Sequence, residues 1–180
     1  MPTNAKTKAK QSAARKIRST QLVGEAHSRK SDALNAIDIL KQDHRQVESY
    51  VAEYEDLEDD TAKGELAKKI CMALTVHMQI EEEIFYPQAR KATKDEDLLD
   101  EAVVEHAGAK HLIAEIEEME AGDDLYDAKV KVLGEQIKHH VQEEEEELFP
   151  EVAAAKMDLA VVGAQMAKRK AHLIAQLAMA

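Results

Sequence analysis

The chain has 180 residues, of which 44% are hydrophobic and only 3% aromatic, and it carries a net charge of −12. Its single cysteine, Cys71, excludes an internal disulfide and a cysteine-based zinc site, and it fits a reducing compartment. Eight of the 24 Lys and Arg residues but only one of the 36 acidic residues lie in residues 1–30, so residues 31–180 carry a net −19. Acidity of that size argues against nucleic-acid binding by this part, because phosphate would be repelled.

Residues 1–30 form a basic segment that contains Ser, Thr and Ala but no sustained apolar stripe. This composition predicts a disordered arm. A targeting peptide or weak nucleic-acid contact stays open, because transit peptides are also Arg- and Ser-bearing and poor in acids. Without a secretory-type apolar segment or an apolar run of ~20 residues, we expect a cytoplasmic protein with no membrane partner.

Four segments downstream place apolar residues three and four apart, as one face of an α-helix demands. The predicted helices span residues 31–58, 61–86, 95–120 and 123–149. Ser31 is a plausible N-cap for the first, and Pro87 and Pro150 are predicted to end the second and the fourth. Short connections between them favour antiparallel neighbours. The sequence therefore predicts an all-α protein whose residues 31–150 form an up-down-up-down four-helix bundle.

The C-terminal segment, residues 151–180, contains a fifth amphipathic stretch at about 156–178. It carries no candidate chemistry. We expect it to form a helix that packs across the bundle or against a partner.

The bundle sequence contains a half-repeat of 62 to 63 residues. Asp43-His44 corresponds to Glu105-His106, and His77-x-x-x-Glu81 corresponds to His140-x-x-x-Glu144. Each half thus consists of an acid-His helix followed by a His-x-x-x-Glu helix. Two such hairpins, packed face to face, would give a pseudo-two-fold bundle.

Six of these side chains lie in line with the apolar stripes, and they are His44, His77, Glu81, His106, His140 and Glu144. A residue and its neighbour four positions on share a helix face, so the pattern directs four imidazoles and two carboxylates into the interior. Two uncompensated buried carboxylates would be costly, which predicts a metal between them. A single histidine on an apolar face is usually a hydrogen-bonded core residue, but four, one on each helix, favour a metal site. The other histidines, at positions 27, 111, 139 and 172, lie off the stripes and are predicted to face solvent.

The donor types suit Fe, Zn, Mn, Cu or Ni, and two carboxylates among four imidazoles suit a pair of ions. Ferritin-type di-iron bundles use Glu-x-x-His on two helices and a lone Glu on the others. Here the order is reversed, the spacing is four and the lone residue is His, which separates this chain from that class.

At residues 40–44, 77–87, 105–106 and 140–150 the sequence resembles the hemerythrin family, specifically the bacterial-type HHE cation-binding domains. The resemblance spans about residues 34–150. It implies a non-haem site for two iron ions, with or without an oxo or hydroxo bridge, in which Glu81 and Glu144 are shared. It also implies chemistry with a small diatomic ligand, dioxygen or nitric oxide, or with peroxide.

One departure from the family pattern concerns a fifth histidine, which oxygen-carrying hemerythrins place four residues from the one on the third helix. Those positions are Ala102 and Lys110 here. Glu48, four residues past His44, is the candidate substitute ligand, and Tyr54 and Tyr126 are candidates for supporting hydrogen bonds. The missing histidine argues against simple oxygen carriage.

The leading functional hypothesis is a di-iron protein for sensing, storage or detoxification of dioxygen, nitric oxide, peroxide or iron. One alternative is an enzyme with peroxidase-like or nitric-oxide-reducing activity at the same site. Another is a structural or interaction bundle with zinc or no metal.

Overall fold

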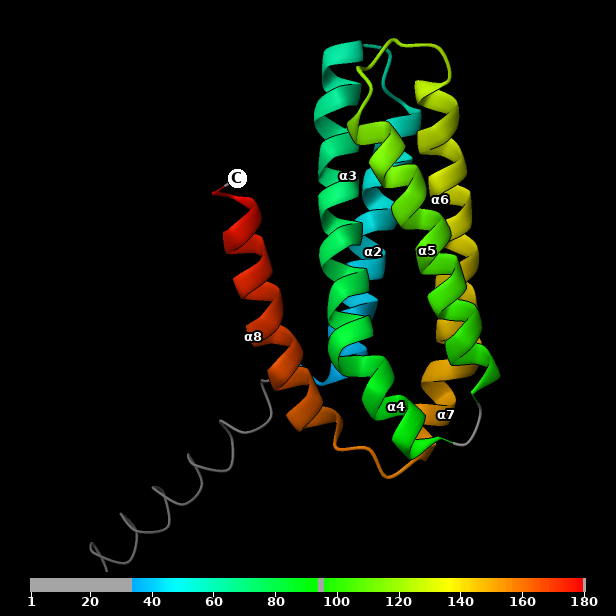
Figure 1. Ribbon diagram of the computed structural model, residues 1–180, viewed down its shortest axis with the longest axis vertical. Helices are drawn as coiled ribbons and strands as arrows, with labels where there is room; N and C mark the ends of the chain where they lie inside the picture. Colours follow the sequence, from blue (N-terminus) through cyan, green and yellow to red (C-terminus); the bar gives the residue numbers. More distant parts are fainter. Residues whose placement is uncertain (1–33, 94–95, 180) are drawn as a thin grey trace, which may run out of the picture. The chain divides into compact units, whose positions relative to one another are not determined.

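The computed structural model describes residues 34–93 and 96–179, and all regular structure in this part of the chain is helical. The predicted arm 1–30, with His27, and the proposed cap Ser31 lie outside the described residues. Four long helices run antiparallel as a bundle (Figure 1): α2 Ala36–Glu55, α3 Asp60–Ile80, α5 Asp97–Glu117 and α6 Tyr126–Glu143. None of the helices in these two stretches is long and apolar enough to cross a membrane. The predicted four-helix architecture is confirmed.

The first helix begins five residues later than the sequence suggested. The Asn35 side chain accepts a hydrogen bond from the Asp38 backbone at 3.2 Å, and Asp38 accepts one from the Asn35 backbone at 3.3 Å. This reciprocal capping box satisfies two backbone donors at once. It therefore fixes the start of α2 at Ala36.

The prediction that Pro87 and Pro150 end their helices is wrong. Each helix passes into a π-helical turn, η1 Glu81–Phe85 and η2 Glu144–Leu148, and then into a short α-helix, α4 Tyr86–Ala92 and α7 Phe149–Ala154. Each proline is the second residue of its short helix, a first-turn position at which a missing N–H costs little. The wider turn thus restarts the helix just before the proline.

The apolar core is divided into two clusters by a polar layer. One cluster includes Leu40, Ile80 and Phe85, and the other includes Val47 and Leu74. On α2, His44 lies between Leu40 of the first cluster and Val47 of the second. The other five predicted metal ligands lie close to it and complete the polar layer between the clusters. The polar layer is thereby shielded from water by packed side chains on both sides.

The C-terminal helix α8, Leu159–Leu177, packs against α2, α3 and η1 (Figure 1). It buries Val162, Met166 and Leu173 in the first cluster. Arg169 adds a two-pronged ion pair to Glu83 at 2.6 and 2.9 Å. The predicted fifth helix is confirmed, and of the two outcomes foreseen for it the structure shows packing across the bundle.

Candidate metal centre

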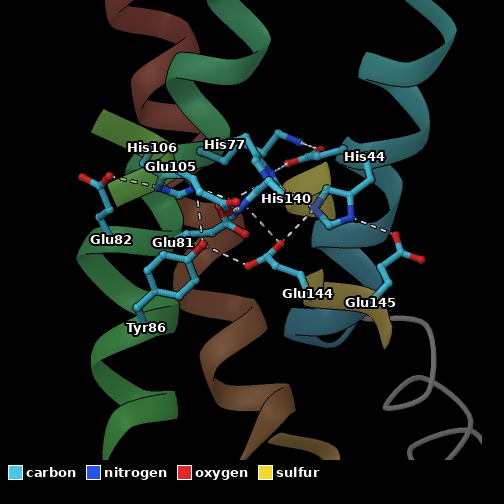
Figure 2. Close-up of polar contacts among 12 residues, drawn as sticks. His44, His77, Glu81, Glu82, Tyr86, Glu105, His106, His140, Glu144 and Glu145 are labelled. Atoms are coloured by element: carbon cyan, nitrogen blue, oxygen red, sulfur yellow. Dashed lines mark hydrogen bonds and ion pairs between the residues drawn. The ribbon is translucent and has the colours of Figure 1, made fainter. Parts of the chain in front are cut away.

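The six residues predicted as ligands come together in one buried layer (Figure 2), and they are His44, His77, Glu81, His106, His140 and Glu144. Each side chain is at most 4% exposed. The four long helices each supply one histidine, and the two glutamates are the first residues of η1 and η2. Because π-turns often mark functional positions, their start at these two glutamates links the local irregularity to the site.

The imidazoles form two close pairs. His44 Nε2 and His77 Nε2 lie 3.2 Å apart, and His106 Nε2 and His140 Nε2 lie 3.1 Å apart. Two nitrogens that bind one ion at about 2.1 Å, roughly at right angles, are about 3 Å apart. Each pair therefore has the spacing of two ligands to one metal.

Each glutamate lies between the two imidazole pairs. Glu81 Oε2 is 3.2 Å from His77 Nε2 and 3.4 Å from His106 Nε2. Glu144 Oε2 is 3.3 Å from His44 Nε2 and 3.7 Å from His140 Nε2. The two carboxylates are thus placed where each could serve both halves of a two-metal centre.

A carboxylate faces the outer nitrogen of every imidazole. Such a partner fixes the tautomer by accepting a hydrogen bond from Nδ1–H, which leaves the Nε2 lone pair free for a metal. The Nδ1 atoms of His44, His106 and His140 have such a hydrogen bond, which directs their Nε2 lone pairs to the interior, whereas His77 Nδ1 has an acidic neighbour, Asp43, but no hydrogen-bond partner among the described residues. The Nδ1–oxygen distances are 2.8 Å for His44–Glu145, 3.5 Å for His77–Asp43, 3.0 Å for His106–Glu82 and 2.8 Å for His140–Glu105.

The charges inside the layer call for a cation. Burial and the nearby Glu144 raise the pKa of Glu81 well above its usual range. Burial opposes ionisation of Glu144 as well, but His44 and the neighbouring imidazoles outweigh it and hold the pKa of Glu144 at about 2. Burial also lowers the pKa of His106 to about 4, which keeps this ring neutral and able to bind metal. Among residues 34–93 and 96–179, no group donates a hydrogen bond to either Glu81 oxygen or to Glu144 Oε2. The donor set and these unpartnered oxygens fit metal cations, which would allow both carboxylates to ionise.

Tyr86 is a site residue that the sequence did not reveal. Its hydroxyl donates to Glu144 Oε1 at 2.9 Å and lies 3.3 Å from His106 Nε2, and burial raises its pKa well above the ordinary value. In an unbroken α-helix, a residue five positions after Glu81 would lie about 140° away from it. The i+5 turn of η1 brings Tyr86 back to that face. The sequence feature that corresponds to this contact is the aromatic-proline pair that follows each His-x-x-x-Glu unit.

Other sequence candidates lie away from the centre. Glu48 is 40% exposed and accepts a hydrogen bond from Arg45 at 2.8 Å, so the structure does not bring it to the site. Tyr54 donates to Asp127 at 2.7 Å, and Tyr126 belongs to the second apolar cluster. The exposed placement predicted for His111, His139 and His172 is confirmed.

Fold and site together define a four-helix-bundle protein with a buried cation-binding layer. The sequence pattern of the Hemerythrin HHE cation binding domain matches residues 35–152, and the chain belongs to this family. The family match agrees with the His/Glu clusters, and both indicate a metal-binding protein.

Two further proteins are similar to this chain. A Hemerythrin HHE cation binding domain-containing protein from Mycobacterium kansasii has the same fold, with a TM-score of 0.67 and 22% identity over 78% of this chain and 87% of that one. A protein from Nostoc sp. named DNA nickase is 29% identical over 129 residues, which are 71% of this chain and 36% of that protein. The chain therefore spans about a third of the length of this relative.

Proposed function

We propose that the protein holds two non-haem iron ions and acts in sensing, storage or detoxification of dioxygen, nitric oxide, peroxide or iron. The observation that carries the proposal is the arrangement of two imidazole pairs, each 3.1 to 3.2 Å apart, with Glu81 and Glu144 within 3.7 Å of both. His44 and His77 would hold one ion and His106 and His140 the other. The glutamates would be shared between them.

The chemistry of the donors supports iron. Imidazole and carboxylate ligands without sulfur suit iron better than structural zinc, which often uses thiolates and a closed tetrahedral shell. Bound iron would supply electrons and open coordination positions to a small ligand. The protein would supply four imidazoles, of which burial lowers the pKa of His77 and of His106, a dry surrounding and one hydroxyl, that of Tyr86, beside Glu144.

A cavity lined by two of the candidate ligands supports a gas or peroxide as ligand. A cavity of about 270 Å³ on the α5–α6 side reaches His106 and His140. Its size suits dioxygen, nitric oxide or peroxide.

We propose a cytoplasmic location and no membrane partner. The acidity of residues 31–180 disfavours the DNA-nicking activity for which the Nostoc relative is named, and any weak nucleic-acid contact would fall to the basic arm 1–30.

Metal analysis of the untagged full chain tests the proposal. We expect about two irons per chain and near-UV and visible charge-transfer bands that respond to azide, peroxide or nitric oxide. The double variant His77→Ala, His140→Ala, which removes one ligand from each pair, should lose both the iron and the bands. Protein that contains no metal, or a single zinc, would contradict the proposal and favour a structural bundle.

Turnover distinguishes a carrier or sensor from an enzyme. The cavity against His106 and His140 would admit a substrate as readily as a ligand. Consumption of peroxide or nitric oxide well above that of the double variant would assign a peroxidase-like or nitric-oxide-reducing activity. Equal rates would assign binding without turnover.

A further inference from the structure

A third group of potential metal ligands lies outside the buried layer, on the surface between α5 and α6. It consists of Glu105, His139 and Glu143, whose ligand atoms lie within 4.8 Å of one another. His139 Nε2 is 3.2 Å from Glu143 Oε1 and 3.7 Å from Glu105 Oε1. The His139 side chain is 65% exposed, so ions in solution can reach it.

The pair His139 and Glu143 repeats the His-x-x-x-Glu unit one residue before His140 and Glu144. One residue turns a helix by about 100°, so this second unit faces the outside of the bundle while the first faces inward. The other half of the chain lacks such a unit. Residues 76 and 80, which correspond to 139 and 143, are valine and isoleucine and are buried in the cluster that α8 covers.

The outer carboxylates differ in their counter-charges. Asp43 pairs with Lys170, Glu82 with Lys110 and Glu145 with Arg45. In the described part of the chain, neither Glu105 nor Glu143 has a Lys or Arg partner. The other three outer carboxylates each have a Lys or Arg partner. Glu105 instead has the imidazoles of His139 and His140 and a second carboxylate, Glu143, so a mobile cation can supply the missing positive charge.

The surface group and the buried centre share a residue and a cavity. Glu105 Oε2 faces His140 Nδ1 while Glu105 Oε1 faces His139. The cavity of about 270 Å³ is lined by His139 as well as by His106 and His140. On the opposite side, a cavity of about 170 Å³ reaches Asp43 and Lys170 but none of the four buried histidines. Of these two cavities, the one on the α5–α6 side is thus the one that is lined by candidate ligands of the buried centre.

We propose that Glu105, His139 and Glu143 capture a divalent cation from solution and pass it through this cavity to the buried centre. Two carboxylates and one imidazole suit Fe²⁺ or Mn²⁺ bound weakly and with several waters. The capture step changes no oxidation state. The proposal concerns metal uptake and so rests on the proposed di-iron function, but the surface site can be measured independently of it.

Manganese binding tests the capture site. After the buried centre of the untagged full chain has been filled with iron, Mn²⁺ titration followed by electron paramagnetic resonance should show one further weakly bound ion. His139→Ala and Glu143→Gln should each lose it. The matched control is His111→Ala, which removes another exposed histidine with a glutamate four residues on. In that pair, Glu115 already has Lys129 as a partner at 3.1 Å. Equal Mn²⁺ binding by wild type and His139→Ala would overturn the proposal.

Loading kinetics test the delivery step. When Fe²⁺ is added to metal-free protein without oxygen, uptake into the centre should be slower by about tenfold in His139→Ala, because a charged capture site raises the local cation concentration. The final iron content should equal that of the wild type. Loss of the Mn²⁺ site with unchanged loading would overturn the delivery role.

The failure of the proposed function would look different. If wild-type protein takes up no iron, the di-iron proposal fails, and Mn²⁺ titration of the metal-free chain still tests the surface site. One ion fewer in His139→Ala than in wild type would then support it, and the same number would reject it.

Discussion

Tyr86 and Phe149 occupy equivalent positions in the two halves of the bundle, directly after the two π-turns, yet they make different contacts with the buried layer of candidate ligands. The Tyr86 hydroxyl donates to Glu144 at 2.9 Å, whereas the Phe149 ring stacks on His44 with centroids 5.8 Å apart and planes 6° from parallel. Both rings therefore stack on a histidine, but only Tyr86 adds a hydroxyl to the centre. This asymmetry gives the two halves of the site unequal chemistry.

Replacing Tyr86 with Phe should alter the centre and leave the fold intact. The change removes one buried hydrogen bond to Glu144, which should cost about 1–3 kcal/mol of stability in the metal-free protein. It should also shift the charge-transfer bands of the iron-loaded protein. Denaturant titration and absorption spectra measure the two effects. Tyr54→Phe serves as the control, because its hydroxyl pairs with Asp127 away from the site, and identical spectral shifts in both variants would refute the assignment.

Replacing Glu81 with Gln should stabilise the metal-free protein and reduce the stabilisation that bound metal provides. The substitution removes one of two neighbouring buried carboxylates, so the metal-free protein should melt at a higher temperature than wild type. The rise in melting temperature on adding iron should be largely lost. In wild type, metal at a hundred times its dissociation constant should add about 2.7 kcal/mol. Calorimetry with and without iron decides this, and an unchanged iron effect in the variant would count against Glu81 as a ligand.

Replacing Asp43 with Asn should weaken metal binding without removing any residue that faces the metals. Asp43 lies 3.5 Å from His77 Nδ1 and pairs with Lys170 of α8, so it places a negative charge behind the imidazole. Loss of such a partner typically lowers metal affinity by about 10- to 100-fold. Chelator competition measures the affinity. Wild-type affinity in the Asn variant would show that His77 is held by packing alone.

Acid should loosen the contact between α8 and the bundle over a defined pH range. Hydrogen bonds from Arg169 and Gln79 lower the pKa of Glu83 from 4.5 to about 2. A carboxylate whose pKa is lower in the folded state stabilises the fold above its unfolded pKa, and that contribution is lost as the pH falls through the folded value. Arg169→Gln should thus melt at a slightly lower temperature than wild type at pH 6, and the difference should vanish near pH 2. A difference that persists at pH 2 would point to lost packing rather than lost charge.

Leu125 should be replaceable with a gain in stability. It is 69% exposed and adopts a left-handed backbone conformation with φ of 72° immediately before α6. Side chains with a Cβ pay roughly 1–2 kcal/mol there, whereas Gly does not. Leu125→Gly should therefore raise stability by up to about 1 kcal/mol once its greater unfolded-state freedom is counted. Leu125→Ala keeps the Cβ and should gain nothing, so an equal gain in both variants would exclude backbone strain as the cause.

The sequence by itself determined the helical bundle and the six residues that meet in its interior. Both follow from periodicity, because the three-and-four spacing decides which side chains share a helix face. His44 and Glu81 stand at positions of this spacing, as the buried leucines do. The half-repeat added the pairing of the two hairpins. Local pattern was also enough to separate His140 from its exposed neighbour His139.

Only the tertiary structure decided what surrounds those six residues. Two π-turns, invisible to a 3.6-residue period, carried the helices past Pro87 and Pro150 and turned Tyr86 toward Glu144. The outer carboxylates are contributed across helices, as Glu145 is to His44, and no local rule relates residues about 100 positions apart. Helix α8 covers the apolar surface that contains Val76 and Ile80 and leaves the equivalent surface of the other hairpin uncovered. Which surface α8 covers depends on which apolar surface remains unburied after the four helices have packed, and the sequence of α8 alone does not specify it.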